Sequence, residues 1–230
     1  MVKKNLISLA IENAEVIFDQ ILDDGLVRDI PIINTVANVI AVGKSVRDTL
    51  FARKLARFLN EINNISDADY EKIRAFALSE DSEEISEKLL NVLDANSEVS
   101  KSEIIANVFL GFVDKKLTAH ELKGVLEIIE KSYSSDLNNF LKTLPVMSSN
   151  IMHLQRGGIS NLVNTPLIEQ KPRTSLSLRT AEDSWKQKQE SQEIYRTTPI
   201  GTQFRNAYLH GISMRGKNAA KSLVDPISSV

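Results

Sequence analysis

The carboxyl-terminal part of the chain has an excess of Lys and Arg, whose side chains could bind an anionic partner. Residues 146–230 hold 11 Lys and Arg against 6 Asp and Glu, whereas residues 62–145 hold 9 basic and 16 acidic side chains. Lys and Arg bind phosphate oxygens, and such binding is steeply salt-dependent. Two partners fit this pattern: nucleic acid, or the acidic middle of the same chain. The predicted contacts are Arg156, Arg173, Arg179, Lys186, Lys188, Arg196 and Arg205.

A second candidate is the stretch from residue 30 to residue 59, where an apolar run, Ile30 to Val42, precedes several cations. The run is shorter than the roughly 20 residues of a membrane-spanning helix. Cations beside an apolar face attract anionic lipid, but a helix with so wide an apolar face is usually surrounded by other helices. We predict a buried helix, with a membrane-surface helix as the alternative. The residues concerned are Ile32, Ile33, Val36, Val39, Ile40, Arg47, Arg53, Lys54 and Arg57.

Catalytic and metal-binding patterns are missing from the sequence. It contains no cysteine, which excludes disulfides and thiolate metal sites and favours a reducing cytosol. His120, His153 and His210 lack the close partners of a metal site, and Gly157-Gly158 lacks the neighbours of a phosphate loop. Residues 112–122 look like half of a calcium-binding helix-loop-helix without its alternating ligands. We expect no catalytic activity, cofactor, metal or small-molecule substrate.

The elements that must position these residues are mainly helices. Helical periodicity runs through residues 1–145 and predicts a helical bundle with short connections. Ser100 with Glu103, and Thr118 with Glu121, have the spacing of capping boxes at two helix starts. The last helix of the bundle is predicted to continue until Pro145, along the apolar stripe Leu137, Phe140, Leu141 and Leu144.

The composition changes after Pro145, where four of the six prolines and many Ser, Thr and Gln appear. Residues 159–163 and 194–197 have the composition of short strands, and residues 164–193 are predicted to form a flexible insertion. Thr198 and Pro199 predict the N-cap and first residue of a helix that extends to about His210. We therefore predict a mainly α protein, with a helical bundle over residues 1–145. A small basic module over residues 146–230 is predicted to be α+β or partly disordered.

Two segments of this module resemble the winged-helix domains of bacteria. Leu154-Gln-Arg-Gly-Gly-Ile159 and Tyr195-Arg-Thr-Thr-Pro-Ile-Gly201-Thr-Gln-Phe204 are similar to the two ends of the signature L..GLI … Y.LT.LG..F. Thr197 stands where the family has leucine, and the insertion between the two segments is long for a wing. The resemblance implies a winged-helix-like end with a role in reading DNA.

A loose set of uncharacterised bacterial proteins is also similar over most of the chain. The similar segments are DGLVRDIPIINTVANVIAVGKSVRDTLFARKLARFL, FVDKKLTAHEL and SYSSDLNNFL. Those proteins share an apolar helical start and a winged-helix-like end, and some occur among accessory or phage-related genes. The resemblance implies the architecture but no mechanism.

Two hypotheses from different classes follow. The first is a non-enzymatic intracellular interaction or regulatory protein whose basic module binds a protein partner or DNA, with self-association covering apolar helices. The second is a membrane-active defence or toxin-like effector that uses the helix over residues 30–59. We favour the first, which places the protein in the cytoplasm, with a peripheral position at the inner membrane as the alternative.

Overall fold

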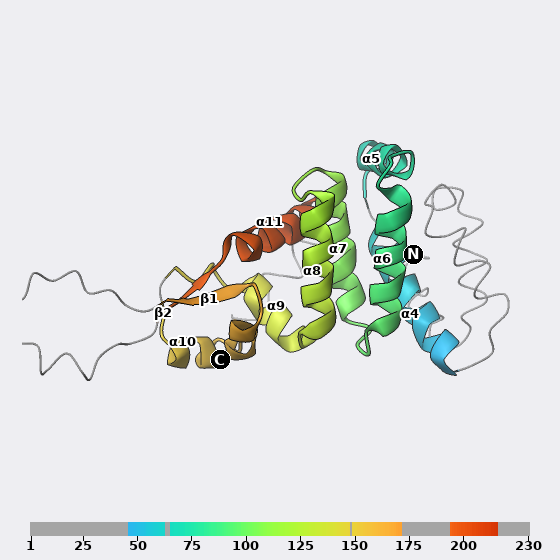
Figure 1. The fold of residues 1–230 in the computed structure, drawn as a ribbon. Coiled ribbons are helices and arrows are strands. Elements are labelled where there is room, and N and C mark those ends of the chain that lie inside the picture. Colours follow the sequence, from blue (N-terminus) through green and yellow to red (C-terminus); the bar gives the residue numbers. More distant parts are fainter. Residues whose placement is uncertain (1–45, 63–64, 148, 172–193, 216–230) are drawn as a thin grey trace, which may run out of the picture. The chain divides into compact units, whose positions relative to one another are not determined.

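The computed structural model describes residues 46–62, 65–147, 149–171 and 194–215. Within these ranges the protein is mainly α, as predicted, with eight α-helices, one short 3-10 helix and a two-stranded sheet (Figure 1). In chain order the elements are α4 (Val46–Ile62), α5 (Asp67–Ala77), α6 (Ser82–Ala95), α7 (Lys101–Val113), α8 (Ala119–Lys131), α9 (Ser134–Lys142), α10 (Ile151–Arg156), η1 (Ser160–Asn164), β1 (Ile168–Lys171), β2 (Ile194–Thr197) and α11 (Pro199–Met214).

The chain divides into two compact units. Unit 1 comprises Met1–Lys131 with Phe204–Val230, and unit 2 comprises Ser132–Gln203. This division differs from the predicted boundary near residue 145, because α9 packs within unit 2. Asp136 of α9 accepts a hydrogen bond of 2.8 Å from the Asn161 amide. Asn139 of the same helix donates to the Gly158 carbonyl at 3.3 Å.

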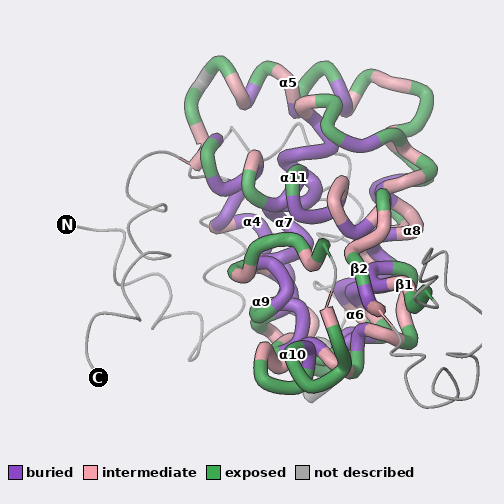
Figure 2. The backbone as a smooth tube through the Cα atoms, turned by 90° about the vertical axis from the view of Figure 1, so that its left-hand side faces the viewer, coloured by how far each residue is buried: buried purple, intermediate pink, exposed green. Residues whose placement is uncertain are grey.

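The core of unit 1 is built around α7, in which every residue except Glu103 is buried. Helix α4 packs against α7 with Leu55, Phe58 and Leu59 fully buried, and each such side chain contributes about 1.5–3 kcal/mol. Figure 2 shows the buried residues gathered along α4 and α7, whereas α5 keeps a largely exposed outer side. The apolar stripe of α4 is therefore covered by the bundle. Ring contacts with centroids 5.4–6.3 Å apart join Phe58, Phe76, Phe109 and Phe112.

Helix starts in unit 1 confirm one predicted capping box and contradict the other. Thr118 Oγ1 accepts a hydrogen bond of 3.2 Å from the Glu121 amide, and Glu121 accepts one of 2.8 Å from the Thr118 amide. The prediction for Ser100 and Glu103 was wrong, because Ser100 has helical backbone angles and its side chain caps nothing. The Glu103 carboxylate instead accepts a hydrogen bond of 2.8 Å from Arg57.

Helix α7 and the unit 1 part of α11 approach each other at two glycines. A Cβ on Gly111 would lie 2.7 Å from Ala207 Cα, and a Cβ on Gly211 would lie 2.6 Å from the Asn107 carbonyl carbon. Both positions therefore require a residue without a side chain.

Unit 2 is a small α+β unit organised around β2. Strand β1 pairs with β2 in antiparallel register, with Ile168 opposite Thr197 and Lys171 opposite Ile194. The short segment before α10 also pairs with β2, through an isolated bridge between Ser149 and Tyr195. The core of the unit contains Leu137, Phe140, Leu154, Ile159, Leu162, Leu167 and Tyr195.

Three local predictions for this part of the chain have clear outcomes. The predicted strand 194–197 is β2, and the Thr198 hydroxyl accepts from the Gly201 amide at 3.1 Å, which confirms the predicted cap of α11. The prediction of a strand over residues 159–163 was wrong, because Ser160–Asn164 form a 3-10 helix. The first predicted insertion residues contain β1, and residues 172–193 lie outside the described ranges.

The predicted end of the apolar stripe was also wrong. The stripe was expected to continue the helix of Ala119–Lys131, but Ser134–Lys142 form the separate helix α9. Thr143 has extended backbone angles, so the helix has ended before Leu144, which is 86% exposed. Leu144 thus lies on the surface rather than in the core.

Candidate functional site

The cations predicted to bind phosphate do not form one described surface. Arg156, at the end of α10, is exposed. Arg196 of β2 is exposed but forms an ion pair with Glu169 of β1. Arg205 belongs to unit 1 and is buried, and burial lowers the pKa of its guanidinium. The predicted contacts Arg173, Arg179, Lys186 and Lys188 lie outside the described residues.

The predicted membrane or core helix is described only in its second half. Ile32, Ile33, Val36, Val39 and Ile40 lie outside the described residues, as does the side chain of Arg47 in α4. Arg53 and Arg57 are half-buried in α4, and Lys54 is 2% exposed. Within the described ranges, no helix has the length and apolarity needed to cross a bilayer.

Two buried lysines of unit 1 close the carboxyl ends of neighbouring helices. Lys54 Nζ donates hydrogen bonds to the carbonyls of Asp94 (2.6 Å) and Asn96 (2.8 Å) at the end of α6. Lys101 Nζ donates to the Glu130 carbonyl at the end of α8 (3.1 Å), and burial lowers the pKa of this ammonium. The last carbonyls of a helix lack intrahelical partners and carry partial negative charge. Both cations are therefore structural.

A second charged group in unit 1 joins α4, α7 and the residue after α11. Arg57 donates to Glu103 and lies 3.8 Å from Glu61, and Arg215 forms an ion pair with Glu61. Burial, followed by repulsion from Arg57, lowers the pKa of Arg215 to about 10. Because these opposite charges are paired with one another, the group ties helices together rather than presenting charge to a ligand.

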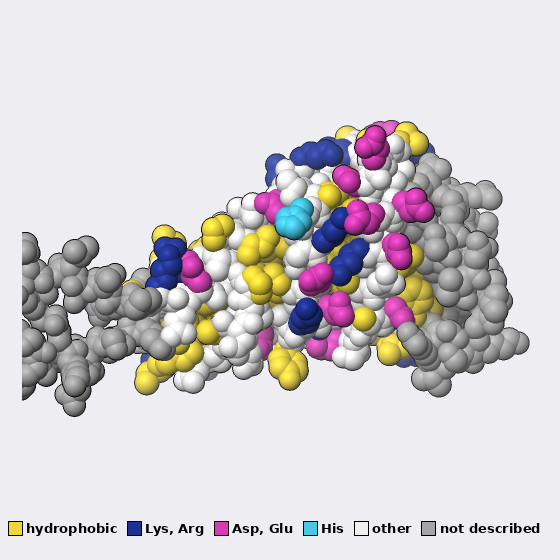
Figure 3. All heavy atoms as spheres, in the orientation of Figure 1, with side chains coloured by type: hydrophobic (Ala, Val, Ile, Leu, Met, Phe, Trp, Pro, Cys, Tyr) yellow, Lys and Arg dark blue, Asp and Glu magenta, His cyan; other side chains and the backbone are white. Residues whose placement is uncertain are grey.

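The exposed side of α6 and α8 carries cations and anions in alternation (Figure 3). Lys88 of α6 pairs with Glu127 of α8 at 3.1 Å, and Lys123 of α8 pairs with Glu84 of α6. Lys88 also lowers the pKa of Glu127, through a hydrogen bond and then through its charge. Alternating signs do not build the single-sign field that attracts a polyanion. This side of unit 1 is therefore a poor nucleic-acid surface.

Unit 2 carries a group of exposed apolar side chains that we call the 144–152 surface, made of Leu144, Met147, Ile151 and Met152. Their exposed fractions are 86%, 84%, 41% and 55%. Figure 3 shows hydrophobic side chains at the molecular surface over α10, which contains the last two of these residues. Large apolar side chains that gather on a surface mark interaction sites more often than scattered ones do.

Val146 and Ser149, which lie between the side chains of the 144–152 surface in sequence, bond to β2 through their backbone. The Val146 amide donates to Thr197 Oγ1 at 2.9 Å, and the Thr197 amide donates back to the Val146 carbonyl at 2.8 Å. Ser149 and Tyr195 exchange hydrogen bonds of 3.1 and 2.8 Å. Asn150 caps α10 by accepting from the His153 amide at 3.0 Å. The apolar side chains thus lie next to backbone groups of Val146, Ser149 and Asn150 that already have hydrogen-bond partners.

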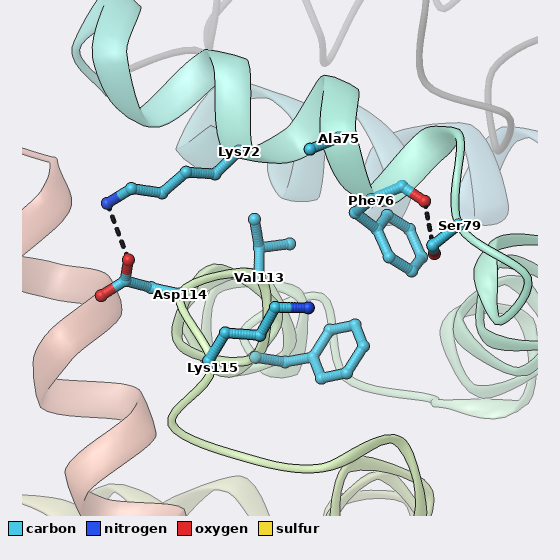
Figure 4. A pocket seen from close by; sticks show the side chains of 8 residues that line it. Lys72, Ala75, Phe76, Ser79, Val113, Asp114 and Lys115 are labelled. Atoms are coloured by element: carbon cyan, nitrogen blue, oxygen red, sulfur yellow. Dashed lines mark hydrogen bonds and ion pairs between the residues drawn. The ribbon is translucent and has the colours of Figure 1, made fainter.

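Unit 1 contains a cleft of about 270 Å³ between α5 and the end of α7. Phe76, Phe112 and Val113 form its apolar wall, and Lys72, Asp114 and Lys115 lie at its border (Figure 4). Lys72 donates to Asp69 and Asp114 at 2.7 Å each, and its hydrogen bonds are the main cause that lowers the pKa of both carboxyls. His210 also pairs with Asp114. These contacts hold the border of the cleft in place.

Sequence reasoning missed both the 144–152 surface and the cleft. Leu144 was assigned to the core because it continued a helical stripe. However, it precedes Pro145, and a proline disfavours helical backbone angles in the residue before it. Met147 and Met152 carry no spacing signal of their own. The cleft joins residues of two helices that are about 40 positions apart, which no local pattern reveals.

The described residues offer no group of three or more His, Cys, Asp or Glu side chains that could hold a metal ion. Comparisons with protein-family models, with curated proteins and with solved structures found no match to this chain.

Proposed function

We propose that this chain is a binding protein without catalytic activity, and that the 144–152 surface of unit 2 docks a protein partner. The observation that carries the proposal is the exposure of four large apolar side chains within nine residues of sequence, two of whose residues, Val146 and Ser149, bond to β2. Removing such side chains from water favours association by about 25 cal/mol per Å² of apolar surface.

The backbone bonds of Val146 and Ser149 to β2 support the proposal because association has an entropic cost. A loop whose backbone must be ordered on binding loses about 1–2 kcal/mol for each residue that becomes fixed. Here backbone hydrogen bonds to β2 already hold Val146 and Ser149. Met147 and Met152 remain free to adjust their rotamers, and methionine adapts well to the shape of a partner.

Photo-crosslinking on the full chain tests this proposal in the organism that makes it. A benzophenone amino acid replaces Met147 or Met152, and in the control it replaces Gln170, an exposed residue of β1. We expect a discrete crosslinked protein from the first two positions and none from the control. Leu144→Glu combined with Met147→Glu should remove the product without lowering the thermal midpoint, since both side chains are exposed. Equal crosslinking from Gln170, or a product that survives both glutamates, would contradict the proposal.

DNA binding by unit 2 is a second candidate function, supported by the order of its elements. Helix α9, the segment paired with β2, helix α10, the 3-10 helix η1, the β1–β2 pair and the start of α11 follow one another, an order that is similar to that of winged-helix domains. Arg156 at the exposed end of α10 is the described cation best placed for a phosphate. Gel-shift titration at rising salt tests it, because phosphate contacts give an affinity that falls steeply with salt. Arg156→Ala should weaken the shift, and an unchanged shift would count against the role of this arginine.

A further inference from the structure

The end of α7, at the border of the cleft, has an unusual residue in its backbone turn. Lys115 has φ 61°, in the left-handed region, and donates its amide to the Phe112 carbonyl at 2.8 Å. The Lys116 amide donates to the Gly111 carbonyl at 2.9 Å, which completes a Schellman motif. Such motifs strongly favour glycine at the left-handed position because a Cβ there meets the backbone.

The end of α10 contains the same motif with the expected residue. Gly158 has φ 63°, its amide donates to the Gln155 carbonyl at 3.0 Å, and the Ile159 amide donates to the Leu154 carbonyl at 3.0 Å. Two helix ends of one chain thus share one geometry, and only α7 places a side chain there. A residue kept in an unfavourable conformation suggests a function for its side chain.

The surroundings of Lys115 indicate what that function is. Lys72 bonds to Asp69 and Asp114, and Lys116 lies 3.6 Å from Asp114. Lys115, by contrast, forms no ion pair or hydrogen bond through its ammonium with any residue that the structure describes. Figure 4 shows this ammonium directed toward the side of the cleft where Phe76 lies, whereas Lys72 turns toward Asp114. The cleft therefore combines an apolar wall with one uncompensated positive charge.

We propose that the cleft between α5 and the end of α7 binds a peptide segment of a partner protein, with an apolar side chain against Phe76 and Phe112 and a carboxylate on Lys115. The volume of about 270 Å³ is below the range of roughly 300–1,000 Å³ that is typical of small-molecule sites. It suits a single anchoring side chain of a larger ligand. Leu78, next to the cleft residue Ser79 in sequence, is 90% exposed.

This site lies wholly in unit 1 and does not depend on the proposed role of unit 2. The test uses the isotope-labelled full chain and two short peptides of the same length. Both contain a central Leu-Phe pair, which is flanked by glutamates in one peptide and by lysines in the other. We expect the glutamate peptide to shift the amide signals of Phe76, Val113 and Lys115, and to bind at least fivefold more tightly than the lysine peptide.

Two variants separate binding from folding. Lys115→Gly should weaken binding of the glutamate peptide at least fivefold while raising the urea midpoint, since glycine relieves the left-handed turn. Ala75→Trp, at an exposed position that lines the cleft, should block binding with the midpoint preserved. Lys116→Ala is the matched control and should leave binding within twofold. Equal binding of both peptides, full binding by Lys115→Gly, or signal shifts confined to other residues would overturn the proposal.

Discussion

Replacing Gly211 with alanine is expected to destabilise unit 1, although alanine is the better helix former. The reason is the close approach of α11 to α7, where the Gly211 Cα faces the backbone of Asn107. A Cβ at this position would lie 2.6 Å from the Asn107 carbonyl carbon and 2.8 Å from its Cα. Two carbon atoms in favourable contact lie about 3.5–4.0 Å apart. The helices would therefore have to separate by about 1 Å.

The magnitude follows from two opposing effects. Overpacking a core costs about 1–3 kcal/mol, and the upper end applies here because the obstacle is backbone rather than a flexible side chain. The higher helix propensity of alanine stabilises the folded state by about 1 kcal/mol relative to glycine in a helix interior. We therefore expect a net loss of about 2 kcal/mol in the free energy of unfolding. Gly111→Ala should behave alike, since its Cβ would lie 2.7 Å from Ala207 Cα.

Gly124 in α8 provides the matched control. A Cβ there would meet no heavy atom within 4 Å. Only the helix propensity remains, so Gly124→Ala should raise the free energy of unfolding by about 0.5–1 kcal/mol. The same substitution is thus expected to have opposite signs on two helices of one unit.

Urea unfolding followed by far-ultraviolet circular dichroism measures this difference. With a slope of about 1–3 kcal/mol per molar urea, the two variants should differ in midpoint by about 1–3 M. If Gly211→Ala unfolds at or above the midpoint of the wild type, α7 and α11 do not cross at Gly211 and the reasoning is refuted. If Gly124→Ala is also destabilised, the comparison loses its control and the Gly211 result no longer reports on the crossing.

Three further predictions concern capping and charge. Thr118→Ala should cost about 1 kcal/mol of unfolding free energy, whereas Ser100→Ala should cost almost nothing because Ser100 makes no cap bond; equal losses in urea titrations would refute this. Lys54→Met should lower the free energy of unfolding by about 1–3 kcal/mol, because the carbonyls of Asp94 and Asn96 lose their hydrogen-bond donor. An unchanged urea midpoint would show that these carbonyls gain another donor. The depressed pKa of Asp114 stabilises the fold above its ordinary value of 3.8, and this contribution is lost as the pH falls through the folded pKa. Asp114→Asn should therefore have a lower thermal midpoint than the wild type near neutral pH and the same midpoint in strong acid. Thermal melts that give the same difference in midpoint at both pH values would contradict this prediction.

The features that sequence predicted well are those whose signals are local. Two helix caps were predicted correctly, at Thr118 with Glu121 and at Thr198 with Pro199. In each, the side chain that caps the helix and the first turn that it caps are within a few residues of each other, so a local pattern reveals them. The strand Ile194–Thr197 is likewise bounded by local signals. The mainly α character follows from periodicity repeated along the chain.

The features that sequence missed depend on contacts between distant residues. Ser100 and Glu103 have the spacing of a capping box, but the chain already turns before Ser100, where the Lys101 amide bonds to the Glu98 carbonyl at 3.2 Å. Glu103 is engaged by Arg57, which lies 46 positions earlier. A signal based on spacing cannot show that one of its members has a stronger partner elsewhere in the fold.

The contacts of three described cations show what a count of charges leaves out. Lys54 closes a helix end, Arg196 pairs with Glu169, and Arg205 is buried, so none of them is a free surface charge. Net charge per segment counts all three as equal to an exposed cation. The informative lysine is instead Lys115, in a segment with an acidic balance, because its backbone conformation disfavours any side chain and its ammonium faces an apolar cleft. A binding site in this protein is therefore better sought where a charged side chain persists at a structural cost than where charges are numerous.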